Sequence, residues 1–148
     1  MSSAEHADRP LLLDASVWLA ALDRDDPHHG SARRLLESTA SGTIELAALD
    51  LTLYEIANVA VVRWHSQVEA ERLVTLVTLA CPATLQRADE ALLRAAAQIA
   101  AQHDLTVYDG AYVAAAARHC WTLVSADLRD LVAPGHAVAP DTAVGLVS

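Results

Sequence analysis

The stretch RPLLLDAS, Arg9 to Ser16, runs three leucines directly into a carboxylate, Asp14. The leucines predict a buried strand over residues 10–13, followed by a helix over about 15–24. Asp14 could simply cap that helix, because Asp is a favoured N-cap residue. The same order of apolar strand, acid and helix recurs at Asp109 in DLTVYDGAYVAAAA and at Asp127 in CWTLVSADLRDL. An unpaired buried charge is costly, so three such positions require a common explanation.

The length and composition indicate one globular domain over residues 1–148. The chain is 53% hydrophobic, which favours a packed core and argues against long disordered segments. No apolar run is long enough to span a membrane, and the first residues, MSSAEHAD, do not resemble a secretory signal. Cys81 and Cys120 have no metal-binding or redox spacing and stand in apolar surroundings. We therefore expect reduced core thiols and a cytoplasmic protein.

The charge balance limits how this chain could interact with nucleic acid. The formal net charge is −9, and all ten basic residues are Arg. Binding of nucleic acid by charge alone is disfavoured, because such proteins are normally basic. An acidic protein can still act on nucleic acid if its carboxylates hold metal ions.

Short apolar segments alternate with helical patterns along the chain. Strands are predicted at residues 10–13, 43–49, 105–108, 121–125 and 136–139. Helices are predicted at 15–24, 30–40, 50–66, 69–80, 89–104, 110–120 and near 127–131. This order is typical of an α/β fold with a parallel sheet covered on both faces. The carboxyl ends of parallel strands share one edge, so Asp14, Asp109 and Asp127 are expected to converge there.

Glu55 is a fourth candidate, one turn into the helix predicted after Asp50, although it could also be a surface residue. Two carboxylates about 4 Å apart repel by about 4 kcal/mol at an effective dielectric constant of 20. A cluster of four therefore needs protons or a cation. Oxygen ligands without His or Cys favour Mg²⁺, or Mn²⁺, over Zn²⁺. A metal held in this way can activate water to hydrolyse a phosphodiester bond.

Four segments together resemble the acidic motifs of PIN-domain nucleases, most closely the VapC-type toxins. They are LLLDAS, LTLYEIANV, TVYDGAYVAAAA and LVSAD, in the family's order and approximate spacing. The resemblance implies a three-layer α/β/α fold with a central parallel sheet. It also implies a Mg²⁺-dependent endoribonuclease that cleaves RNA. Its expected partners are a second copy of the chain in a homodimer and a VapB-type antitoxin, which blocks the acidic pocket and helps to bind promoter DNA.

The resemblance assigns roles residue by residue. Asp14, Glu55, Asp109 and Asp127 match the metal-binding, catalytic carboxylates. Ser16 matches a small hydroxyl residue that often follows the first Asp. Ser125 stands where the family commonly has Thr, and it keeps the hydroxyl group.

Several other residues are weaker candidates. Asn58, one turn after Glu55, could hold that carboxylate or contact the substrate. Asp130 could be a fifth carboxylate near the metal, although a cap or a solvent-facing residue is the more common role. His28 and His29, beside a proline turn, are interpreted as part of a solvated loop near the dimer or substrate edge.

Arginine and aromatic residues complete the set of candidates. Possible phosphate contacts, each also interpretable as a surface residue, are Arg33, Arg34, Arg63, Arg72 and Arg118. Four aromatic residues at helical spacing are interpreted first as core or dimer interface, with base stacking open for one of them: Trp18, Tyr54, Tyr112 and Trp64.

Two other classes of function are compatible with an acid at the end of a strand. A haloacid-dehalogenase-like phosphatase needs an acid two residues after the first Asp, where this chain has Ser16. That phosphatase and phospho-receiver domains both use a Lys, and this chain has none. The alternative that stays open is a catalytically silent PIN-like module that only binds a protein partner. Loss of an acidic motif would be its signature, and all four motifs are intact.

Overall fold

The computed structural model describes residues 9–148, and the MSSAEHAD segment considered above lies outside them. Its centre is a four-stranded sheet of β1 (Leu11–Leu13), β2 (Leu46–Leu49), β3 (Leu85–Gln86) and β4 (Thr122–Val124). The strand order is β3-β2-β1-β4, and all pairs are parallel. Leu12 of β1 lies opposite Ala47 on one side and Leu123 on the other. The predicted parallel sheet is confirmed.

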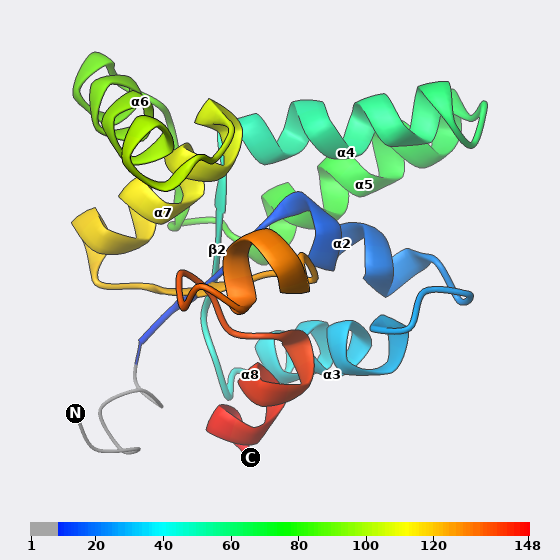
Figure 1. Cartoon of the computed structure of the whole chain (residues 1–148). Coiled ribbons are helices and arrows are strands. Elements are labelled where there is room, and N and C mark those ends of the chain that lie inside the picture. Colours follow the sequence, from blue (N-terminus) through cyan, green and yellow to red (C-terminus); the bar gives the residue numbers. More distant parts are fainter. Residues whose placement is uncertain (1–8) are drawn as a thin grey trace.

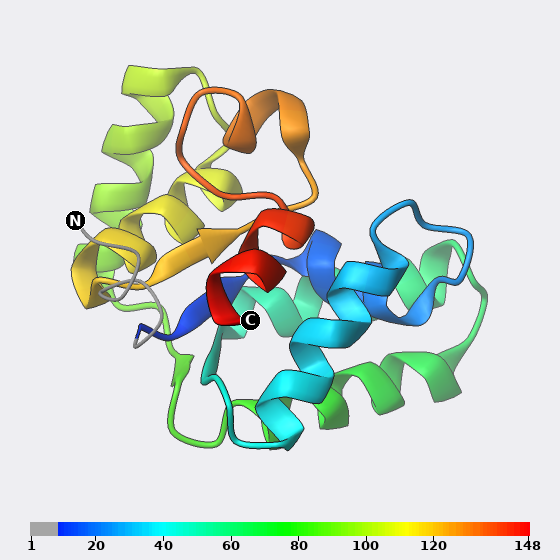
Figure 2. The same ribbon diagram turned by 90° about the horizontal axis from the view of Figure 1, so that it is seen from below.

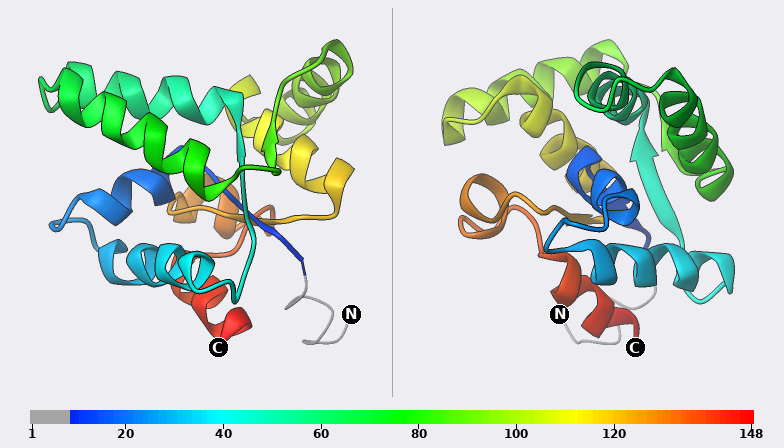
Figure 3. Two further views of the ribbon diagram at one scale, coloured as in Figure 1. Left: turned by 180° about the vertical axis from the view of Figure 1, so that it is seen from behind. Right: turned by 90° about the vertical axis from the view of Figure 1, so that its right-hand side faces the viewer.

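Helices connect and cover the strands (Figure 1). Their bounds are α2 (Ala15–Leu22), α3 (His29–Ala40), α4 (Asp50–Val62), α5 (Gln67–Ala80), α6 (Glu90–His103), α7 (Val107–His119) and α8 (Pro140–Val147), with a π-helical turn, η1 (Leu128–Val132). Helices α4 and α5 lie side by side as an antiparallel pair (Figure 3). Helix α8 lies beside α3, as the view from below shows (Figure 2).

The alternation of side chains along the strands produces a core on each face of the sheet. Leu11 and Leu13 of β1 point to one face, where they pack with residues of α2, α3, α5 and α8. Leu12 points to the other face and packs with residues of α6 and α7. The expected three-layer α/β/α arrangement is therefore confirmed.

The contact between α6 and α7 depends on a glycine. A Cβ atom on Gly110 would lie 2.4 Å from the carbonyl oxygen of Ala96, which is too close for any L side chain. Gly110 therefore lets α7 approach the backbone of α6. The residues on either side of it, Asp109 and Ala111, take their positions from this close packing.

The expected strand at residues 105–108 is wrong, because this segment begins α7 instead. Thr106 is the N-cap of the helix, and its hydroxyl oxygen accepts a hydrogen bond from the backbone N–H of Asp109 at 3.1 Å. A threonine followed three residues later by an acid is a helix-start signal, and here it outweighs the β-branched character of LTVY. Asp109 is therefore the third residue of α7 and does not follow a strand directly.

Other differences between the predicted and the observed secondary structure lie in the second half of the chain. The predicted strand at residues 136–139 is reduced to a single bridge between Val124 and Val138. The sequence pattern did not predict β3, which has only two residues, or α8, which begins at Pro140.

The two cysteines differ in burial. Cys81 is buried as expected, and burial raises the pKa of its thiol to about 12. Cys120 was wrongly placed in the core: it is exposed, at the left-handed C-cap of α7.

Across residues 9–148, no helix combines the length and apolar character needed to cross a membrane.

Candidate active site

The candidate site lies at the carboxyl ends of β1 and β4, which are adjacent in the sheet. Asp14 directly follows β1, and its backbone N–H donates to the carbonyl oxygen of Val124 at 3.1 Å. Asp127 follows β4 after two intervening residues and caps η1. Parallel neighbours thus bring two acids that are far apart in the sequence to the same edge.

Asp14 is a buried carboxylate with hydrogen bonds to both oxygens, and only 6% of its surface is exposed. The hydroxyl of Ser125 donates to Oδ2, and the hydroxyl of Ser16 donates to Oδ1. The backbone N–H of Val17 also donates to Oδ1, at 3.4 Å, so Asp14 is the N-cap of α2 as well. Burial raises the pKa of Asp14 to about 6, although the hydrogen bonds from Ser125, Ser16 and Val17 act in the opposite direction.

The two serines connect the loops on either side of Asp14. The oxygen of Ser16 accepts a hydrogen bond from the backbone N–H of Ala126 at 3.0 Å. The oxygen of Ser125 accepts one from the backbone N–H of Asp127, also at 3.0 Å. Each serine therefore donates to Asp14 while it holds the turn after β4. Ser16 and Ser125, the two hydroxyl residues that the family resemblance singled out, are thus both in contact with Asp14.

Glu55 enters the site from the second turn of α4. The phenol of Tyr112, in α7, donates a hydrogen bond to Glu55 Oε1 at 2.8 Å. Burial raises the pKa of Glu55, the Tyr112 hydrogen bond lowers it, and the charge of Asp109 raises it. The sequence pattern predicted Tyr112 first as a core or dimer-interface residue, with base stacking open for one of the four aromatic residues, and not as a partner of Glu55. Its place one turn after Asp109, on the same helix, was the signal that could have identified it.

Asp109, in the first turn of α7, interacts electrostatically with Glu55 and with the acids that follow β4. Burial raises its pKa, and the charges of Asp127 and Asp130 raise it further. Asp127 accepts a hydrogen bond from the backbone N–H of Asp130 at 3.0 Å. Asp130 forms an ion pair with its neighbour Arg129, which lowers the pKa of the Asp130 carboxyl. Asp14, Glu55, Asp109 and Asp127 thus form a row in which each carboxylate acts electrostatically on the next, and Asp130 also acts on Asp109.

The donor chemistry of this row fits a hard divalent cation. All of its side chains offer oxygen, and within residues 9–148 none of Asp14, Glu55, Asp109 and Asp127 forms an ion pair with a basic side chain. In the same part of the chain, no three His, Cys, Asp or Glu side chains stand in an arrangement that could already hold a metal ion. Without a cation the carboxylates repel one another, and the raised pKa values of Asp14, Glu55 and Asp109 have that repulsion as one cause.

The weaker candidates are placed differently. Asn58 was predicted to hold Glu55 or to contact the substrate, but it is exposed and makes no hydrogen bond with Glu55 in the described structure. The ring of His29 bonds to the carbonyl oxygen of Ala20 at 2.8 Å, so this histidine joins α3 to α2. Among the arginines, Arg118 forms a two-pronged ion pair with Asp89, away from the acidic row.

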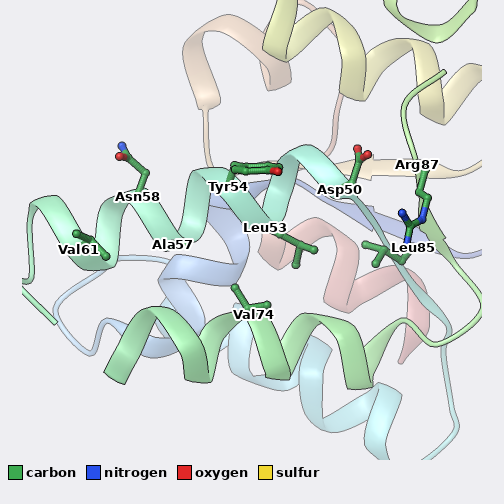
Figure 4. Close-up of a pocket in the computed structure, with 9 residues that line it drawn as sticks. All are labelled: Asp50, Leu53, Tyr54, Ala57, Asn58, Val61, Val74, Leu85 and Arg87. Carbon is green, nitrogen blue, oxygen red and sulfur yellow. The ribbon is translucent and has the colours of Figure 1, made fainter. Parts of the chain in front are cut away.

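A separate apolar groove of about 660 Å³ runs along α4 and α5 (Figure 4). Leu53, Tyr54 and Val61 line it from α4, and Val74 lines it from α5. Its polar members are Asp50, Asn58 and Arg87. The groove lies on the same helix as Glu55 but does not include that residue.

The fold and the site together define a class: α/β proteins with a parallel sheet and a row of carboxylates at the carboxyl edge of the sheet. The sequence pattern of the PIN domain matches residues 11–133, which is most of the chain and includes all four acids. The chain belongs to the PIN domain family. That membership supports a nuclease, an enzyme that hydrolyses phosphodiester bonds of nucleic acid.

Solved structures with the same fold include three from bacterial toxin systems. VapC20 of Mycobacterium tuberculosis, a toxin that cleaves the sarcin-ricin loop, is 21% identical with a TM-score of 0.69, covering 84% of this chain and 95% of that one. A toxin–antitoxin complex from Klebsiella pneumoniae is 16% identical with a TM-score of 0.63, covering 88% and 97%.

VapBC2 of Rickettsia felis, bound to a DNA fragment from its promoter, is 11% identical with a TM-score of 0.61, covering 87% and 96%. At these identities the likeness establishes the fold. No curated protein sequence matches the chain.

Proposed function

We propose that this protein is a Mg²⁺-dependent endoribonuclease and the toxin of a toxin–antitoxin pair. The observation that carries the proposal is the row of Asp14, Glu55, Asp109 and Asp127 at the carboxyl edge of a parallel sheet, where none of the four forms an ion pair with a basic side chain among residues 9–148. Burial raises the pKa of Asp14, Glu55 and Asp109. Membership of the PIN domain family supports the nuclease activity. Likeness to VapC20, a toxin that cleaves the sarcin-ricin loop, supports RNA as the substrate.

In this proposal the four carboxylates hold the metal, Mg²⁺ or alternatively Mn²⁺. When bound, the ion supplies activation of water and stabilisation of negative charge on the phosphodiester oxygens. Ser125 and Ser16 keep Asp14 in a fixed orientation, since each hydroxyl donates to one of its oxygens. Asp14, Glu55 and Asp109 come from α2, α4 and α7 or their caps, so the rigid packing of these helices sets the spacing of the ligands.

The proposed partners are an RNA substrate, a second copy of the chain in a homodimer and a VapB-type antitoxin. The complexes from Klebsiella pneumoniae and Rickettsia felis support an antitoxin. The apolar groove along α4 and α5 suits an apolar segment of such a partner, because the exposed side chains of Tyr54 and Val61 line it beside Leu53 and Val74 (Figure 4). A location in the cytoplasm remains a prediction.

Cleavage of total cellular RNA by antitoxin-free protein tests the activity. We expect discrete fragments from the wild type with Mg²⁺, and none with EDTA or with Asp14→Asn. Asp25→Asn is the matched control, because Asp25 is exposed and lies in the loop between α2 and α3. Absence of cleavage in every condition would refute the nuclease and favour the silent module that binds a protein partner.

A further inference from the structure

A chain of three hydrogen bonds ends on Glu55. The backbone N–H of Leu49 bonds to the hydroxyl oxygen of Thr52 at 3.3 Å, Thr52 bonds to the phenol of Tyr112 at 2.8 Å, and Tyr112 bonds to Glu55 at 2.8 Å. This series of hydrogen bonds joins the end of β2 to the first turn of α4, continues to α7, and returns to α4 at Glu55.

The direction of this chain is fixed by its two ends. A backbone N–H can only donate, so Thr52 accepts from Leu49. An ionised carboxylate can only accept, so Tyr112 donates its proton to Glu55, and its oxygen receives the proton of Thr52. All three protons therefore point toward Glu55. Aligned hydrogen bonds of this kind polarise one another and strengthen the last one.

Both hydroxyl residues are held rigidly. Thr52 is fully buried, and Tyr112 is only 2% exposed, within the core between the sheet and α7. Tyr112 also lies one turn after Asp109 on α7. These hydrogen bonds therefore connect Glu55 to the helix that carries Asp109, although the negative charges of Glu55 and Asp109 repel each other.

The bond to Tyr112 leaves half of the carboxylate available. It occupies Oε1, and Glu55 Oε2 has no hydrogen-bond donor among the described residues. A glutamate has three rotatable side-chain bonds, so an unrestrained Glu55 would lose considerable freedom on binding a cation. One oxygen fixed by a rigid phenol reduces that cost and presents the other oxygen.

We propose that Tyr112 is a positioning residue that orients the Glu55 carboxylate for a divalent cation, with Thr52 acting through Tyr112. This inference rests on the proposed metal-dependent function. The role goes beyond packing, because it belongs to the phenolic hydroxyl and not to the aromatic ring. It predicts that removal of a single oxygen atom weakens cation binding while the core stays intact.

The test is calorimetric titration of Mg²⁺ into the metal-free full-length protein. Tyr112→Phe removes the hydroxyl and keeps the ring. We expect its dissociation constant for Mg²⁺ to rise about tenfold, the lower range for groups that orient metal ligands. Tyr108→Phe is the matched control: Tyr108 lies on the same helix, is exposed, and makes no hydrogen bond through its hydroxyl in the described structure. Its affinity should equal that of the wild type.

Thr52 provides a second, independent test with a rescue. Thr52→Val interrupts the series of hydrogen bonds and should weaken Mg²⁺ binding by about threefold. Thr52→Ser keeps the hydroxyl and should retain most of the affinity. Circular dichroism confirms that each variant is folded. Wild-type affinity in a folded Tyr112→Phe variant would overturn the positioning role. Failure of the wild type itself to bind Mg²⁺ would instead overturn the proposed metal site, and this inference with it.

Discussion

Ser125 donates a hydrogen bond to Asp14 across 111 positions of sequence, and the two oxygen atoms are 2.5 Å apart. This contact exists because β1 and β4 are neighbours in the sheet, so that the residues after them meet. The same serine oxygen accepts the backbone N–H of Asp127. One hydroxyl thus connects two acids of the candidate site.

Removal of the Ser125 hydroxyl should lower both the stability of the fold and the cleavage activity. Ser125→Ala deprives Asp14 of a donor and leaves the N–H of Asp127 without its acceptor. We expect the free energy of unfolding to fall by about 1–3 kcal/mol and cleavage to decrease, while Ser125→Thr keeps the hydrogen bonds and most of the activity. Chemical denaturation and a cleavage assay measure the two effects. Equal activity in the Ala and Thr variants would contradict the role of the hydroxyl.

The buried charge of Asp14 should make stability depend on pH in the metal-free protein. Its pKa is 3.8 ordinarily and about 6 in the folded protein, so the folded state binds the proton more tightly than the unfolded state. The wild type should therefore lose stability as pH rises from about 4 to about 6, by up to about 3 kcal/mol from this residue.

Asp14→Asn isolates this contribution, because Asn carries no charge. The variant should be more stable than the wild type at pH 7 in EDTA, and the difference should shrink toward pH 4. Excess Mg²⁺ should reduce the difference at pH 7 by stabilising the wild type alone. Thermal unfolding at several pH values measures it. A difference that does not change with pH would contradict the buried-charge explanation.

The contact of Gly110 with α6 should tolerate no larger residue. Gly110→Ala places a Cβ against the backbone of Ala96, so we expect a loss of about 1–3 kcal/mol and reduced cleavage, because Asp109 and Tyr112 lie on the same helix. Gly145→Ala in α8 is the control: nothing lies within 4 Å of its added Cβ, so it should be neutral or slightly stabilising. Denaturation midpoints test both, and equal stability of the two variants would refute the steric argument.

The apolar groove along α4 and α5 should be needed for inhibition and not for catalysis. Val61→Glu places a charge at the groove without changing the acidic row. We expect RNA cleavage at the wild-type rate and at least a tenfold weaker inhibition by the cognate antitoxin. Val68→Glu on α5 is the control, since Val68 is similarly exposed but does not line the groove. Full inhibition of the Val61→Glu variant would place the antitoxin elsewhere.

The sequence by itself determined β1, β2 and β4, their parallel arrangement and the position of Asp14 at the end of β1. LLLDAS is informative because an apolar run, an acid and a helix follow one another directly in the sequence. Such a local pattern can be recognised without knowledge of the tertiary structure. The error at residues 105–108 is also local: LTVY has strand-like side chains, yet the cap formed by Thr106 starts a helix. Two-residue β3 is too short for any periodicity to reveal it.

Only the tertiary structure decided how the acids are held. The hydrogen bonds from Ser125 to Asp14 and from Tyr112 to Glu55 join residues 111 and 57 positions apart. Such contacts depend on the strand order and on where α4 and α7 lie around the sheet. Burial of the whole core decides both. Asn58 shares the helix of Glu55 and was predicted either to hold that carboxylate or to contact the substrate, but Tyr112 from another helix donates the hydrogen bond to Glu55. Local spacing limits which residues can meet, whereas long-range packing selects which of them do.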